Sequence, residues 1–105
     1  MALTRAFKET VQARAQRDSA FRAALLAEGI ETLLAGDVDA GKAILRDYIN
    51  ATVGFVSLAA ATGTQPKSLM RMFSANGNPT AANLTDVIRV LQKKTGVQLE
   101  VRATA

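Results

Sequence analysis

The sequence contains neither cysteine nor histidine. Without cysteine, the chain has no disulfide framework and no thiolate metal site. Without histidine, it lacks the commonest metal ligand and the commonest general base of enzymes. Acidic residues are sparse, and no glycine-rich loop precedes the Lys-Ser or Lys-Thr pair that cradles phosphates. We therefore expect a protein that is not an enzyme and that holds neither a metal ion nor a cofactor.

Long apolar runs are also missing. No uninterrupted run approaches the roughly 18 residues of a membrane span, and the first residues lack an apolar signal core. We therefore expect a cytoplasmic protein that does not enter a membrane. The chain has only four phenylalanines and one tyrosine among 105 residues, whereas alanine and leucine are abundant and β-branched runs are few. This composition favours a helical fold of single-domain size.

Acidic residues are especially few in the second part of the chain. Residues 1–62 contain seven basic and seven acidic side chains, whereas residues 63–105 contain six basic and two acidic ones. The whole excess of the net charge of +4 therefore lies after residue 62. An excess of this kind favours a polyanionic partner, although mildly basic small proteins are common.

Hydrophobic spacing and capping residues predict three helices in the first half of the chain. The first starts at Thr4, ends near Gln16 and has few apolar side chains. Asp18 is the expected N-cap of the second helix, whose broad apolar stripe stops at Gly36. Asp39 is the expected N-cap of the third.

Residues 55–74 are the most informative part of the chain, because they predict two short helices joined by a tight turn. Gly63 falls at the turn, where the backbone needs a positive φ that glycine adopts without steric cost. Pro66 suits the first turn of the second helix, where its missing N–H has no partner. Ala59 is small enough to let the helices cross closely, and the apolar wedge between them is Leu58, Leu69 and Met72. This pattern is typical of a DNA-binding helix-turn-helix.

The second of these helices carries the candidate DNA-binding side chains. Gln65 and Lys67 lie at its start, which is the part of a recognition helix that reaches base edges. Arg71 lies one turn further on, where it suits guanine or phosphate, with a solvated helix charge as the alternative. Ser68 and Ser74 are short donors suited to phosphate. The following turn and helix start supply three further candidates, Asn78, Thr80 and Asn83. A plain turn with a helix cap explains Asn78 and Thr80 equally well.

The C-terminal part predicts one more helix and a strand. Thr80 is a suitable N-cap for this helix and Gly96 a suitable end. Residues 97–102 then alternate strictly between apolar and polar side chains, which is the pattern of a strand. No other segment of the sequence predicts a strand, so the backbone of this one would stay unpaired in a single copy. Pairing about a two-fold axis would solve this and would suit palindromic DNA half-sites about 34–36 Å apart. The alternative is a tail packed on its own domain.

We therefore predict an all-α protein, a bundle of five or six helices with a λ-repressor-like helix-turn-helix and a short C-terminal β-strand. Residues 1–36 are interpreted as an N-terminal helical extension. Residues 37–105 are interpreted as the helix-turn-helix DNA-binding domain together with the strand. The two parts are expected to form one compact unit.

The sequence also resembles a known family. Its helix-turn-helix is similar to the Cro/λ-repressor type and, more narrowly, to that of the small antidote (antitoxin) proteins of bacterial addiction modules. The likeness spans roughly residues 20–102 and rests on Leu58-Ala59, Thr62-Gly63, Ser68-Leu69, Arg71, Ser74, Gly77-Asn-Pro-Thr80 and Gly96-Val-Gln-Leu-Glu-Val101.

This resemblance implies a homodimeric repressor that binds double-stranded DNA at the operator of its own operon. It also implies that the protein neutralises a co-encoded toxin, and that Gln65, Lys67, Ser68 and Arg71 read the DNA. The alternatives are a stand-alone or phage-derived repressor and a protein-interaction module that holds a toxin through residues 4–36.

Overall fold

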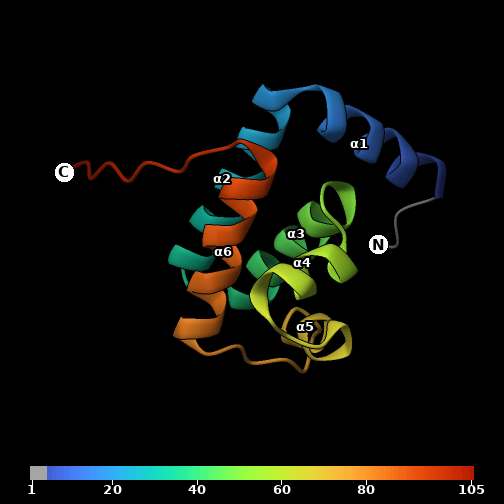
Figure 1. Ribbon diagram of the computed structural model, residues 1–105. Coiled ribbons are helices and arrows are strands. Elements are labelled where there is room, and N and C mark those ends of the chain that lie inside the picture. The colour runs from blue at the N-terminus through green and yellow to red at the C-terminus, as the bar shows by residue number, and fades with distance from the viewer. Residues whose placement is uncertain (1–4) are drawn as a thin grey trace.

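The computed structural model describes residues 5–105, which form six α-helices and no strand (Figure 1). The helices are α1 (Arg5–Arg17), α2 (Ser19–Leu34), α3 (Val38–Ala51), α4 (Phe55–Thr62), α5 (Pro66–Met72) and α6 (Ala81–Thr95). The prediction of an all-α bundle with five or six helices is therefore confirmed. Thr4, the predicted first residue of the first helix, lies outside the described residues.

Two aspartates set the starts of α2 and α3. The carboxylate of Asp18 accepts a hydrogen bond from the Phe21 N–H at 3.1 Å, which confirms the predicted cap and lowers the pKa of Asp18. The prediction that Asp39 caps α3 is wrong, because Asp37 accepts from the Ala40 N–H at 3.2 Å instead. An N-cap needs a non-helical backbone, and Asp39 already lies inside the first helical turn.

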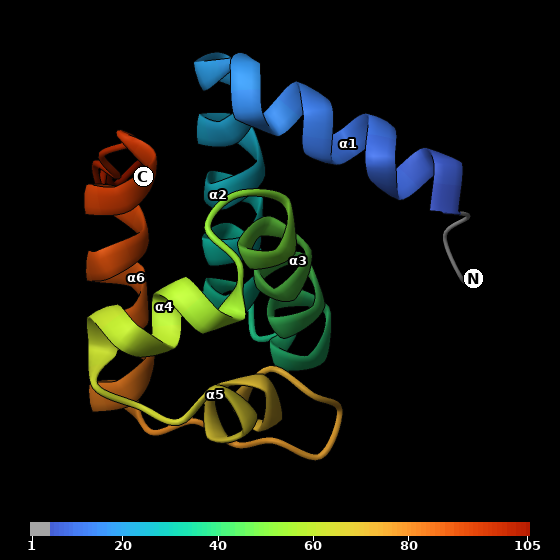
Figure 2. The same ribbon diagram turned by 45° about the vertical axis from the view of Figure 1, so that its right-hand side comes forward.

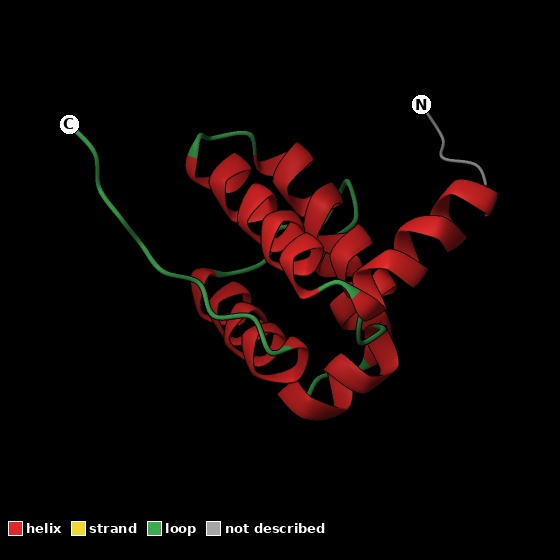
Figure 3. Cartoon of the chain, turned by 90° about the horizontal axis from the view of Figure 1, so that it is seen from above, coloured by secondary structure: helices red, strands yellow, loops and turns green. Residues whose placement is uncertain are grey.

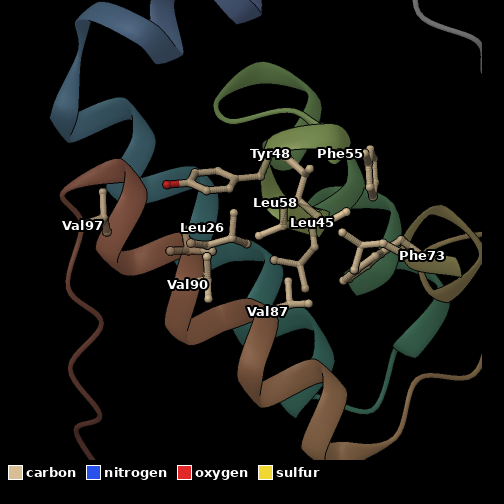
Figure 4. Packing of buried hydrophobic residues seen from close by; sticks show 13 residues of the cluster. Leu26, Leu45, Tyr48, Phe55, Leu58, Phe73, Val87, Val90 and Val97 are labelled. Atoms are coloured by element: carbon tan, nitrogen blue, oxygen red, sulfur yellow. The ribbon is translucent and has the colours of Figure 1, made fainter. Parts of the chain in front are cut away.

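The core joins α2 to the four helices that follow it. Helices α2 and α3 pack closely where Gly29 faces Leu45, since a Cβ added to Gly29 would lie 2.9 Å from Leu45 Cδ2. Figure 4 shows Leu26 of α2 reaching the same cluster as Val87 and Val90 of α6. The buried members of this cluster are Leu26, Leu45, Tyr48, Ile49, Phe55, Leu58, Ala59, Leu69, Phe73, Val87, Val90, Leu91 and Val97.

Tyr48 is the largest polar side chain in this core and is fully buried. Its hydroxyl donates to Thr95 Oγ1 at 2.8 Å, and the Thr95 hydroxyl in turn donates to the Leu91 carbonyl at 2.7 Å. This chain of hydrogen bonds ties α3 to the last turn of α6. Burial raises the pKa of the Tyr48 phenol, because the apolar surroundings disfavour the phenolate.

The free energy of unfolding is expected to fall as the pH rises above about 10, the ordinary pKa of tyrosine. Below that pH the Tyr48 phenol keeps its proton in the folded and in the unfolded chain. Above it, the phenol ionises first in the unfolded chain, because its pKa is raised in the folded one. This difference favours unfolding. Tyr48→Phe should remove this component and cost about 1 kcal/mol at neutral pH. Urea unfolding of both proteins at several pH values measures the difference. Tyr48 is the only tyrosine, so phenolate absorbance follows it directly, and ionisation at the ordinary pKa in the folded state would contradict the prediction.

The predicted strand at residues 97–102 is absent from the single copy that the structure describes. This segment is extended but unpaired, and the chain from residue 97 to 105 leaves the helical body as a tail (Figures 1 and 3). Val97 is buried, and the Leu99 N–H donates to Gln92 Oε1 at 2.8 Å. A strand needs a second extended backbone beside it, and residues 5–105 contain none.

A bilayer needs an apolar helix of about 20 residues to cross it. None of the helices in residues 5–105 combines sufficient length with sufficient apolar character.

Candidate nucleic-acid interface

Helices α4 and α5 are joined by a three-residue turn, 63–65. Gly63 ends α4 in the left-handed conformation, with φ of 70°, and Pro66 is the first residue of α5. The N–H groups of Gly63 and Thr64 both donate to the Ala59 carbonyl, the second at 3.0 Å. These contacts confirm the predicted roles of Gly63 and Pro66. They fix the direction in which the chain enters α5.

One side of α5 is buried against the rest of the protein. Leu69 is fully buried, as is Leu58 on α4, and the small Ala59 is buried with them. The ring of Phe73, just after α5, packs at 55° against that of Phe55, with the ring centroids 6.3 Å apart. The two helices cross rather than run side by side (Figure 2). These contacts hold the inner side of α5 against α4 and the core and determine which side of α5 faces solvent.

The outer side of α5 presents cationic and polar side chains to solvent. Gln65, Lys67, Ser68 and Arg71 are all exposed, and the Gln65 side chain makes no capping hydrogen bond. Neither cation takes part in any ion pair among residues 5–105. The sequence from residue 48 to residue 85 contains no aspartate or glutamate. The charges of Lys67 and Arg71 are therefore not paired with any carboxylate of residues 5–105.

Two basic residues of α3 hold the far end of α5, and neither is among the residues predicted from the sequence. Lys42 is only 4% exposed, and its Nζ donates to the carbonyls of Ser74 at 3.0 Å and Gly77 at 2.7 Å. Arg46 Nη1 donates to the Phe73 carbonyl at 3.2 Å. At the Ser74 carbonyl, Lys42 adds a second hydrogen bond to the one from the Gly77 N–H at 3.1 Å. One signal was present, because Lys42 lies three residues before Leu45, on the apolar stripe of α3.

The remaining predicted site residues follow α5. The Ser74 hydroxyl donates to the Arg71 carbonyl at 2.7 Å, so its proton closes the helix end rather than facing a phosphate. Thr80 caps α6 as predicted, since its Oγ1 accepts from the Asn83 N–H at 3.1 Å. Asn78 and Asn83 are exposed. Figures 1 and 2 both place α5, the loop after it and the start of α6 at one end of the molecule, away from the C-terminal tail.

The fold and this face define an all-helical protein with an exposed, cationic second helix in a helix–turn–helix arrangement. Among residues 5–105, no three side chains of the metal-ligating types come together. Comparison of the chain with protein-family models, with curated proteins and with solved structures found no match.

Proposed function

We propose that the chain is a sequence-specific DNA-binding transcriptional regulator, a homodimer that represses its own operon. The observation that carries the proposal is the pair of exposed cations, Lys67 and Arg71, on the outer face of α5. No acid within the described chain neutralises them. Phosphate and guanine offer the acceptors that such a pair lacks in the free protein.

The dimensions of α5 suit the major groove. Its seven residues make a helix about 10 Å long, and the groove of B-DNA is about 12 Å wide. In this arrangement Gln65 and Lys67 face base edges, while Ser68 and Arg71 contact base or phosphate. Asn78, Thr80 and Asn83 then lie beside the flanking phosphates, because the loop after α5 and the start of α6 occupy the same end of the molecule as α5 (Figure 2). Ser74 serves to end α5 and is not a contact in this proposal.

The test is binding of the unmodified protein to the DNA upstream of its own gene, measured over a range of salt concentrations. The logarithm of affinity should fall linearly with the logarithm of salt, with a slope of about −0.9 for each phosphate contact. Scrambled DNA of the same length should bind far more weakly. Absence of salt-dependent binding, or equal affinity for scrambled DNA, refutes the proposal.

A second candidate function is protein binding, and an apolar groove of about 430 Å³ favours it. Leu34 at its rim is 79% exposed. Exposed acidic side chains lie close in sequence to the groove residues, namely Glu31, Asp37 and Asp39. Asp39 already pairs with Lys42, which also lines the groove, at 3.6 Å. The apolar lining comes from α2, α3, α6 and the loop before α6, and includes Ile30, Leu33, Leu34, Val38, Leu84 and Ile88. An apolar groove beside acidic groups suits a basic polypeptide, such as the toxin of the module that the sequence resembles.

Leu34→Asp is expected to abolish co-purification with the product of the adjacent gene and to leave DNA affinity unchanged. The reason is that an aspartate places a charge against the apolar segment that the groove would bury. Ala13→Asp on α1 adds the same charge at an exposed position away from the groove and serves as the control. If both variants retain the partner, the groove does not hold it.

A further inference from the structure

The C-terminal tail has the chemistry of a strand without a partner. Val97 is buried and Leu99 packs partly on the core, whereas Val101 is 96% exposed. Apart from the bond between Leu99 and Gln92, residues 97–105 make no hydrogen bond or ion pair within the described chain. The tail therefore presents unpaired backbone groups and one fully exposed apolar side chain. Both features mark a segment that pairs with another backbone.

Symmetry and charge restrict how two copies of this tail can pair. In an antiparallel pair about a two-fold axis, one residue lies opposite the same residue of the second copy. The residue before it then lies opposite the residue after it in the second copy. If Glu100 lies opposite Glu100 of the second copy, two negative charges repel each other. If Arg102 lies opposite Arg102, two positive charges do so. If Val101 faces itself, Glu100 faces Arg102 of the second copy, and this favourable pair occurs twice. Only this third register buries the exposed valine and pairs every charge of the tail.

We propose that residues 97–105 pair with the same residues of a second copy as an antiparallel ribbon, in the register that places Val101 opposite Val101. The partner is thus a second copy of this chain, and the inference rests on the homodimer of the proposed function. A two-stranded ribbon alone has marginal stability in water. Here Val97 and Leu99 anchor each strand to its own core, so the ribbon extends an existing apolar cluster.

The position of the tail is compatible with DNA recognition by both copies. The tail leaves the end of α6 that lies away from α5 (Figures 1 and 2), so pairing leaves both cationic faces uncovered.

Cysteine scanning tests the register, because the chain has no cysteine of its own. Residues that face each other have Cα atoms about 4.5–5.5 Å apart, within the range that a disulfide spans. Val101→Cys should therefore form a disulfide-linked dimer readily under mild oxidation. Leu99→Cys and Ala103→Cys should each fail alone but cross-link when the two variants are mixed, since residue 99 faces residue 103 in this register.

Sedimentation equilibrium without DNA tests the charge pairs. Glu100→Arg should raise the dimer dissociation constant about tenfold or more, because two attractive pairs become repulsive. Combining Glu100→Arg with Arg102→Glu should return the dimer dissociation constant to within about threefold of that of the unmodified protein. A chain ending at residue 98 should be monomeric, with circular dichroism showing that its helices remain.

A dimer that persists without residues 99–105, or a Val101→Cys variant that does not cross-link, overturns the inference. The inference is also overturned if the unmodified chain is monomeric at high concentration. The failure of each proposal can be distinguished. A monomer with salt-dependent operator binding refutes the ribbon and the homodimer but leaves DNA binding, whereas a cross-linked dimer without DNA affinity refutes DNA binding and leaves the ribbon.

Discussion

Replacing Lys67 and Arg71 together by alanine should lower the affinity of the protein for its operator by about a hundredfold or more. Each contact of these side chains with a base or a phosphate is worth about 1–3 kcal/mol, and neither has an internal partner to lose. Both positions are exposed and helical, so alanine should preserve the fold. Fluorescence anisotropy with labelled operator DNA, repeated at several salt concentrations, measures both the affinity and its salt slope.

The matched control removes the same charges from another part of the molecule. Lys8 and Arg17 are exposed residues of α1, which lies away from α5 (Figure 2). The double variant Lys8→Ala with Arg17→Ala has the same net charge as the α5 double variant. Its operator affinity should change by only a few fold, through long-range attraction alone. Equal losses for the two double variants would show that net charge, rather than α5, determines binding.

Wherever a backbone conformation depends on local chemistry, the sequence was sufficient to predict it. Gly63 and Gly96 both adopt the left-handed conformation at the ends of their helices. Pro66 starts α5 and Thr80 caps α6. Each of these roles involves only a few neighbouring residues, so steric and hydrogen-bonding rules decide it.

The predictions that failed depend on groups outside the local sequence. Asp37 and Asp39 are equally good caps by composition, and only the path of the chain out of α2 determines which one is used. The strand at residues 97–102 needs a second backbone that the described chain lacks. Lys42 was missed because its acceptors are more than 30 residues away, at Ser74 and Gly77. A one-dimensional pattern contains no signal that links such distant groups.

The turn after α5 gives the second large expected effect. Gly77 lies under the end of α5, where an added Cβ would overlap the Arg71 carbonyl oxygen and lie 2.7 Å from the Met72 carbonyl oxygen. These obstacles are backbone atoms, so no side-chain movement relieves them. Gly77→Ala should therefore force the turn open and cost about 2–3 kcal/mol of the free energy of unfolding. Urea denaturation measures this loss.

The same substitution should also weaken DNA binding in the molecules that stay folded. Opening the turn displaces the Gly77 carbonyl that Lys42 binds at 2.7 Å, and with it one of the contacts that orient α5. Gly36→Ala is the control, because Gly36 has a φ of 95° but no atom within 4 Å of an added Cβ. It should cost about 1–2 kcal/mol through backbone strain alone and leave operator affinity unchanged. If Gly77→Ala is as stable as the unmodified protein, the close approach at this turn is refuted. If it is destabilised but binds DNA normally, Lys42 stabilises the fold without orienting α5.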